Sequence, residues 1–196
     1  MRLKEGNKEK DILEAAVKVF AEEGFHKAKI STIAESAGVA TGSVYLYFKN
    51  KDDLLNTIFQ GLWERLYDEL KIISDNKVLS PGEKIDAMLD LVFDIFTENP
   101  SLALVFVNEQ HNLMRNNKEG FISYYEKFLD EGEKVVNEGM DKNVFSSNLD
   151  VKIFRHFIFG AIRNMLHQWA SSPKSFTLNK IRQNVKYLTR HGITKI

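Results

Sequence analysis

A short segment around residue 45 carries side chains that can contact DNA. Ser43, Tyr45 and Tyr47 stand at alternate positions in TGSVYLYF, and Lys49 and Lys51 follow directly. Hydroxyl groups hydrogen-bond base edges and phosphate oxygens, and ammonium groups neutralise phosphates. Two neighbouring tyrosines on a short polar segment are poorly explained as core residues. In the alternative interpretation, one tyrosine packs inside the protein and the other has no function.

The residues that position this segment have the pattern of a helix, a tight turn and a second helix. Ile33 belongs to the apolar face of the first helix, and Gly38 lies where the chain reverses, because glycine accepts a positive φ at no steric cost. In the second helix Val44 and Phe48 are four residues apart, so both face the core, and we expect Thr41 to cap its start. This pattern is typical of a helix-turn-helix, whose second helix enters the major groove of DNA.

The same region resembles a known family. Residues 20–55, FAEEGFHKAKISTIAESAGVATGSVYLYFKNKDDLL, are similar to the DNA-binding domain of the TetR family of bacterial repressors. The similarity is carried, at the family's spacing, by Phe20, Gly24, Phe25, Ile33, Ala34, Ala37, Gly38, Val39, Gly42, Ser43, Tyr45, Tyr47, Phe48, Lys51, Leu54 and Leu55. The chain differs from the family before the first helix of the motif, where Ala28 and Lys29 replace a capping threonine. Ser31 or Thr32 can substitute for that cap.

From the motif and the resemblance we predict the DNA contacts. The residues expected to approach bases and phosphates are Thr41, Gly42, Ser43, Tyr45, Leu46 and Tyr47, and those expected mainly to neutralise phosphates are Lys29, Ser31, Lys49 and Lys51. Helix-turn-helix proteins usually bind as two-fold dimers, because one recognition helix reads few base pairs. We therefore expect a homodimer on a palindromic operator in double-stranded DNA.

Composition and charge limit the other possibilities. The chain has 196 residues, 43% of them hydrophobic and 11% aromatic, which is ample for a packed core. Its net charge of zero conceals an uneven distribution, +2 over residues 1–51, −8 over 52–173 and +6 over 174–196. Cysteine is absent, which excludes disulfides and thiol-based zinc sites. With neither a signal region nor an apolar run long enough for a membrane span, we expect a soluble cytoplasmic protein without membrane contact.

Beyond the motif every segment has a helical pattern. Asn50, Asn99 and Asp150 are predicted helix caps, and Ser80 opens a capping box that ends at Glu83. We therefore predict an all-α chain. Residues 1–50 form its three-helix helix-turn-helix DNA-binding domain, and residues 51–196 form a helical ligand-binding and dimerisation domain that begins with a connecting helix at 51–73. The TetR resemblance implies the same layout.

The last two helices are the predicted dimer surface. Apolar residues recur along residues 150–171 and 178–190, and in the TetR family two such helices form a four-helix bundle across the dimer. The predicted interface residues are Phe154, Ile158, Ala161, Met165, Trp169, Ile181, Val185 and Leu188. The alternative is that this face is ordinary core within one chain.

A ligand cavity is predicted from the aromatic side chains between residues 85 and 169. Many large side chains in a helical domain can enclose an elongated apolar cavity, and the alternative is plain core. The predicted ligand residues are Phe93, Phe96, Phe106, Glu109, Phe128 and Phe157, with His111, Arg115, His156 and Arg163 as further polar candidates. The run DVKIFRHFIFGAIRNMLHQW, with NEQHNLMRN upstream, resembles FadR-type TetR repressors of fatty-acid degradation. This resemblance implies a long-chain fatty acyl effector, acyl-CoA.

The sequence thus favours a ligand-responsive repressor, and other functions are weighed against it. A TetR-type regulator of efflux or another pathway would bind a different hydrophobic ligand, and an architectural DNA binder would lack the cavity. An enzyme is disfavoured, because the five histidines have no metal-ligand spacing and no nucleophile, phosphate-loop or dinucleotide motif is present. No cofactor or metal is expected. We expect the effector to tilt the connecting helix, so that the two recognition helices no longer fit major grooves about 34–36 Å apart.

Overall fold

The chain is helical throughout the part that the structure describes. The computed structural model describes residues 8–115, 119–171 and 176–194, apart from the side chains of residues 110–115, 119–121 and 171. Nine helices account for most of these residues, which confirms the predicted all-α class. Contacts between residues divide the chain into two units, Met1–Leu62 with Pro100–Phe121 and Trp63–Asn99 with Ile122–Ile196.

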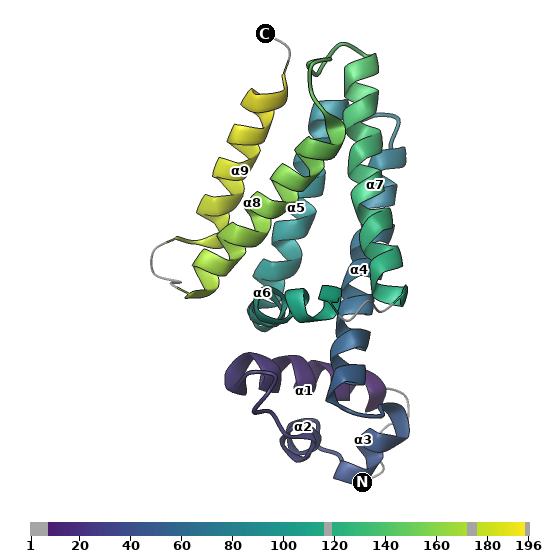
Figure 1. The fold of residues 1–196 in the computed structure, drawn as a ribbon, viewed down its shortest axis with the longest axis vertical. Helices are drawn as coiled ribbons and strands as arrows, with labels where there is room; N and C mark the ends of the chain where they lie inside the picture. The colour runs from purple at the N-terminus through teal and green to yellow at the C-terminus, as the bar shows by residue number, and fades with distance from the viewer. Residues whose placement is uncertain (1–7, 116–118, 172–175, 195–196) are drawn as a thin grey trace. The chain divides into compact units, whose positions relative to one another are not determined.

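The first unit contains the helix-turn-helix. It is built from α1 (Lys8–Glu23), α2 (Ile30–Ser36), α3 (Thr41–Tyr47), the first turns of α4 (Lys51–Asp75) and α6 (Pro100–Arg115) (Figure 1). Helix α1 packs against α2, α3 and α6, and it buries the apolar stripe of its sequence, including Ile12 and Phe20. The helix ends at Gly24, whose φ of 79° is the left-handed conformation that glycine adopts at helix ends.

The turn between α2 and α3 has the predicted form. Gly38 has a φ of 67°, and its amide donates to the carbonyl of Glu35 at 3.0 Å. Val44 is fully buried and Phe48 is 3% exposed. These two side chains hold α3 against the rest of the unit, so the residues between them face outward.

The predicted caps of these two short helices are wrong. The residue that precedes α3 is Ala40, which has an extended backbone and no side-chain hydrogen bond, and Thr41 is already helical. Likewise α2 begins after Lys29, so Ser31 lies inside the helix. A capping side chain has to leave from the extended residue just before the helix, and both hydroxyls come too late in the chain. The predicted cap of α4 is confirmed, because the carboxamide oxygen of Asn50 accepts from the amide of Asp53 at 2.9 Å.

The second unit consists of the later turns of α4 with α5 (Pro81–Glu98), α7 (Glu119–Asp141), α8 (Val151–Ser171) and α9 (Leu178–Ile193) (Figure 1). The capping box at the start of α5 is confirmed, since Ser80 and Glu83 exchange side-chain and backbone hydrogen bonds. Asp150 precedes α8 as its predicted cap, and its carboxylate accepts from the amide of Ile153 at 2.9 Å.

An aromatic cluster joins α4, α7 and α8 in this unit. The ring of Trp63 lies edge-on to Tyr125 at 5.0 Å and to Phe128 at 5.1 Å, and its centroid is 5.9 Å from that of Phe159. Edge-to-face arrangements of this kind add about 0.5–1.5 kcal/mol per pair to the free energy gained by burial. Trp63 therefore fixes the later turns of α4 against α7 and α8.

Charge pairs tie α5 to its neighbours. The ammonium of Lys84, 1% exposed, donates to the carbonyl of Ser74 at 2.8 Å and to the carboxylate of Glu138 at 2.7 Å, and so joins the end of α4, α5 and α7. Hydrogen bonds from Lys142 and from Lys84 lower the pKa of Glu138, which keeps this carboxylate ionised.

A ladder of ion pairs joins α5 to α9. Aspartates at every fourth position of α5 face basic residues at every fourth position of α9, and the ladder consists of Asp86, Asp90, Asp94, Arg182, Lys186 and Arg190. The ammonium of Lys186 lies 2.6 Å from the carboxylate of Asp90. Matched spacing on the two helices fixes their relative position along the axis.

Candidate DNA interface and ligand cavity

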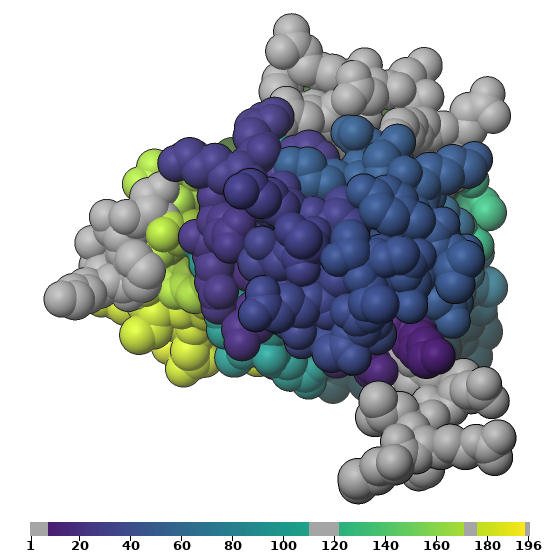
Figure 2. All heavy atoms as spheres, turned by 90° about the horizontal axis from the view of Figure 1, so that it is seen from below, coloured from purple at the N-terminus to yellow at the C-terminus, as the bar shows by residue number. Residues whose placement is uncertain are grey.

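The outer side of α3 presents an exposed aromatic and apolar surface. The exposed fractions are 56% for Tyr45, 83% for Leu46 and 43% for Tyr47. Thr41 is exposed and Ser43 half-buried on the same short helix. Atoms of this unit's first helices, purple to blue, form the face shown in Figure 2. Because nothing in the described chain covers these side chains, they are available to a partner.

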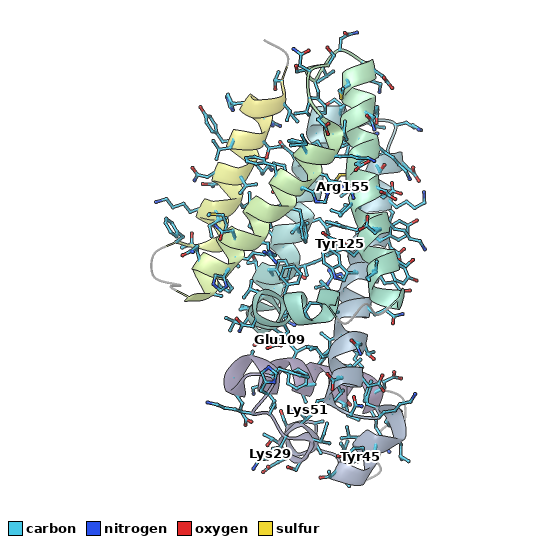
Figure 3. All side chains as sticks on the ribbon, viewed as in Figure 1. Lys29, Tyr45, Lys51, Glu109, Tyr125 and Arg155 are labelled. Carbon is cyan, nitrogen blue, oxygen red and sulfur yellow. The ribbon has the colours of Figure 1, made fainter. Side chains whose placement is uncertain are left out.

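Basic side chains flank this surface. Lys29 precedes α2 and Lys49 follows α3, and both are exposed, as are Ser31 and Gly42. Figure 3 places Lys29 and Tyr45 at the outer side of the unit. The predicted DNA residues other than Lys51 thus all lie on the helix-turn-helix or directly beside it, and all are exposed apart from the half-buried Ser43. Exposed hydroxyl, aromatic and basic side chains of this kind suit a surface that contacts bases and phosphates.

Lys51 has a structural role instead of the predicted phosphate contact. Its ammonium donates to the carbonyls of Phe25 at 2.7 Å, His26 at 3.0 Å and Ala28 at 2.8 Å, and it lies 5.0 Å from the centre of the Phe25 ring. An ammonium has three hydrogens to donate, so all of them are used inside the unit; Lys51 is labelled in Figure 3. Lys51 therefore anchors the loop before α2 to the start of α4.

The second unit contains a partly open cavity of about 100 Å³. All five helices of the unit contribute to its lining: Leu70, Ile85, Met88, Leu89, Val92, Phe128, Leu129, Gly132, Glu133, Val136, Val151, Phe154, Arg155, Ile158, Phe159, Ile162 and Thr189. The lining residues of α8 run from Val151 to Ile162, a distance of roughly 16 Å at the helical rise. The cavity is therefore elongated, yet smaller than the engineered apolar cavity of about 150 Å³ that holds one benzene in another protein.

One part of the lining is polar. Arg155 of α8 pairs with Glu133 at 2.8 Å, with Asp130 at 3.4 Å and with Glu126 at 3.3 Å, all three on one face of α7. Figure 3 shows Arg155 between these two helices. Thr189 of α9 is 3% exposed and also lines the cavity. Every other lining residue is apolar or glycine, so the cavity suits a largely apolar ligand.

Most of the predicted ligand residues lie elsewhere. Of the six, Phe128 alone is among the lining residues. Phe93 and Phe96 are buried outside the lining, and Phe106 and Glu109 are buried in the first unit, where Phe106 stacks on Phe59 at 6.0 Å. Phe157 is 68% exposed on α8, which contradicts its prediction as a ligand residue. His156 and Arg163 are exposed, and the side chains of His111 and Arg115 lie outside the described residues.

The residues of the predicted dimer surface differ in how deeply they are buried within one chain. Ile181 and Val185 are buried within the chain and are therefore core residues, whereas Phe154 and Ile158 are half-buried and line the cavity. Ala161, Met165 and Trp169 are half-buried, and Leu188 is 67% exposed. The outward face instead carries Ile153, Phe157 and Tyr187, which are 69%, 68% and 59% exposed. The two helices lie where they were predicted in the chain, and their role as the dimer surface stays a prediction.

Over the described side chains, no three histidine or acidic groups gather as a metal site would require. Among the described helices, none combines the length and apolar character that a membrane span needs.

The first unit therefore defines a helix-turn-helix DNA-binding protein, and the second unit gives it a largely apolar cavity. Residues 12–58 match the model of the bacterial regulatory proteins of the tetR family, and residues 78–175 match a tetracyclin repressor-like C-terminal domain. The chain belongs to the TetR family and is a DNA-binding transcriptional repressor, not an enzyme.

Individual relatives are similar over nearly the whole chain. The fatty acid metabolism regulator protein of Bacillus subtilis (strain 168) is 32% identical over 189 residues, which cover 93% of each chain. The structure of the fatty acid degradation regulator FadR from Bacillus halodurans has a TM-score of 0.82 at 31% identity, and the match covers 95% of this chain and 96% of that one. FadR from Bacillus subtilis in complex with stearoyl-CoA has a TM-score of 0.80 at 29% identity, over 94% and 98% of the two chains.

The role of Lys51 is tested by comparing two neighbouring lysines. Lys51→Ala removes three hydrogen bonds to loop carbonyls, and we expect the free energy of unfolding to fall by about 1–3 kcal/mol. Lys49→Ala, at an exposed position, should change it by less than about 0.5 kcal/mol. Urea denaturation followed by circular dichroism measures both. Equal stability of the two variants would return Lys51 to the group of phosphate contacts.

Proposed function

We propose that this chain forms a homodimer that represses transcription and leaves its operator when a long-chain acyl compound, best represented by acyl-CoA, enters the cavity of the second unit. The observation that carries the proposal is the elongated apolar cavity, whose walls include α4. The likeness to a regulator solved with stearoyl-CoA supports the choice of ligand. In this proposal residues 1–50 bind DNA and residues 51–196 bind effector and partner.

The DNA contacts follow from the exposed side of the helix-turn-helix. Tyr45, Leu46 and Tyr47 would approach bases, with Thr41, Gly42 and Ser43 beside them. Lys29, Ser31 and Lys49 would hold phosphates and set the position of α3 without reading sequence. Two copies related by a two-fold axis would read two half-sites of a palindrome.

The dimer would form through the outward faces of α8 and α9. Ile153, Phe157, Tyr187 and Leu188 are large side chains that remain exposed on these helices. Exposed apolar groups gathered on neighbouring helices are typical of an interface, and α8 and α9 are in contact. A two-fold axis would bring the same face of a second copy against them.

Effector entry would act on α4. The cavity is too small for a long acyl chain, so its walls have to move apart. Leu70 of α4 is one of these walls, and Lys51 at the start of the same helix holds the loop that precedes α2. A shift of α4 would therefore move the loop that supports the helix-turn-helix. Effector and DNA would then oppose each other's binding to the same extent, as linkage requires.

Release by effector is the direct test of this function. An operator found by in vitro selection, labelled with a fluorophore, would be titrated with the protein with and without stearoyl-CoA below its micelle concentration. We expect DNA affinity to fall at least about tenfold, within the usual range of coupling between sites. Fluorescence anisotropy of the labelled operator measures the fraction of DNA that is bound. Unchanged DNA affinity in the presence of stearoyl-CoA would exclude this compound as an effector.

The contribution of α3 is tested at Tyr47. Tyr47→Ala removes an exposed ring and its hydroxyl, and we expect a loss of about 1–3 kcal/mol in binding to the selected operator, because a lost base contact is worth that much. Binding to unrelated duplexes should change little. Anisotropy with both duplexes measures the difference, and circular dichroism confirms folding. An equal loss on both duplexes would make Tyr47 a phosphate contact.

The dimer surface is tested by introducing a charge. Phe157→Asp places a carboxylate in the middle of the proposed interface, where its desolvation is costly, and we expect a monomer in sedimentation velocity. Val78→Asp is the matched control, since Val78 is 92% exposed outside α8 and α9, and it should leave the dimer intact. A stable dimer of the Phe157 variant would place the interface elsewhere.

A further inference from the structure

The outward face of α8 and α9, where the proposed dimer would form, carries basic side chains but no acidic ones. The chain contains no aspartate or glutamate after Asp150. The exposed positions of α8 form one stripe that repeats every three or four residues, and its members are Lys152, Ile153, His156, Phe157, Gly160, Arg163, Asn164, His167 and Gln168. The exposed side chains of α9 are likewise neutral or basic. This face therefore offers positive and neutral groups alone.

The acidic groups next to this face already have partners. On α7 the carboxylates of Glu126, Asp130 and Glu133 surround Arg155 of α8. On α5, which contacts α9, the three aspartates of the ladder pair with the basic residues of α9. Asp150 caps the start of α8. These carboxylates are therefore not free to offset positive charge on the outward face.

Two histidines lie within the exposed stripe of α8, each one turn from a cation. His156 follows Lys152 by four residues and His167 follows Arg163 by four, a spacing that places both members of a pair on the same side of a helix. His156 also adjoins Phe157, which is 68% exposed and would be covered in the dimer. Histidine changes its charge between pH 5 and 8. In the dimer, desolvation and nearby positive charge would both disfavour the protonated ring.

Two-fold symmetry makes this conclusion independent of the angle at which the helices cross. An isologous interface places the same face of a second copy against the first, so the second copy again supplies only neutral and basic side chains. A protonated His156 or His167 would find no carboxylate on the opposite face in any register. In the monomer both rings are exposed to water, which hydrates the charged form.

The histidine on α9 is in a different position. The ring of His191 lies 3.9 Å from that of Tyr187, and its Nδ1 donates to the carbonyl of Tyr187 at 2.7 Å. His191 is in the last turn of α9, where the helix dipole favours a positive charge. Its own helix thus supports the protonated form, and we assign the pH response to α8.

We infer that dimerisation through this face requires neutral His156 and His167, so that acidification below about pH 6.5 converts the dimer to monomers. The inference rests on the dimer of the proposed function and adds a signal that regulates it. The monomer binds protons at these histidines that the dimer excludes, so the dimer is favoured at high pH and is lost as the pH falls. Because a palindromic operator requires two copies, its occupancy would fall with the dimer.

The pH dependence of the dimer dissociation constant is the direct test. Sedimentation velocity of the full chain over a dilution series measures this constant at about pH 7.5 and about pH 5.5, at equal ionic strength, on either side of the range in which histidine titrates. We expect it to rise at least about tenfold at the lower pH, the effect of one excluded proton per dimer. Circular dichroism at both pH values confirms that the helices remain folded.

Glutamine variants assign the effect to α8. A chain with both His156→Gln and His167→Gln keeps neutral polar side chains at every pH, so it should dimerise and its dissociation constant should change by about threefold or less. Each single variant should lose part of the pH effect. His26→Gln is the matched control, because His26 is exposed in the first unit, and it should retain the full effect.

The outcomes separate this inference from the proposed function. Equal dissociation constants of the wild type at the two pH values, or an unchanged pH effect in the double variant, would overturn the inference and leave the dimer in place. A wild type that is monomeric at both pH values would overturn the dimer and the pH response together. If glutamine at both positions prevents dimerisation, the two single variants decide, because an undiminished pH effect in both would overturn the assignment to α8.

Discussion

Ion pairs between neighbouring helices are the interaction on which the second unit depends. Arg155 joins α7 to α8, the aspartate ladder joins α5 to α9, and Lys84 joins the end of α4 to α5 and α7. An exposed pair contributes only about 0.2–1 kcal/mol, but pairs that share partners act as a network. Because these bonds lie around the interior, the helices keep their positions although the apolar side chains between them leave space unfilled. The cavity is the consequence.

The same pairs explain how the interior can widen. Close-packed apolar cores resist insertion, since extra volume forces side chains out of their preferred rotamers. Long charged side chains tolerate larger displacements, because their flexible stems follow the partner group. Walls held by Arg182, Lys186 and Arg190 can therefore separate further than walls held by methyl groups alone, which a long chain in a cavity of about 100 Å³ would require.

Local signals in the sequence were sufficient to predict the helices and the helix-turn-helix. Gly38 needs a positive φ, Ser80 and Glu83 form a reciprocal cap, and Val44 with Phe48 leaves the tyrosines outside; each of these depends on residues at most a few positions apart. Such patterns can be read without knowing the fold, because the chain itself brings the groups together. The TetR resemblance rested on the same residues.

The cavity could not be predicted in this way, because its residues come from five helices. On α8 two apolar faces compete, and only contacts with other helices decide that Phe154 and Ile158 face inward and Phe157 outward. On α9 the four-residue repeat of Ile181 and Val185 continues to Thr189, which is buried, whereas the apolar residue Leu188 is exposed. Extending the four-residue repeat strictly would have predicted that Thr189 is buried. Nothing local indicated that Lys51 binds carbonyls more than twenty positions earlier.

The aspartate ladder also reduces the unpaired positive charge near the C-terminal end of the chain. Residues 174–196 carry six basic side chains and no acidic ones, a composition that by itself suggests a second surface for nucleic acid. Arg182, Lys186 and Arg190 are instead neutralised by Asp86, Asp90 and Asp94. The long-range field that steers a protein toward DNA depends on unpaired charge. The chain's own aspartates thus act as fixed counterions, and they leave the helix-turn-helix with less competition during the search for an operator.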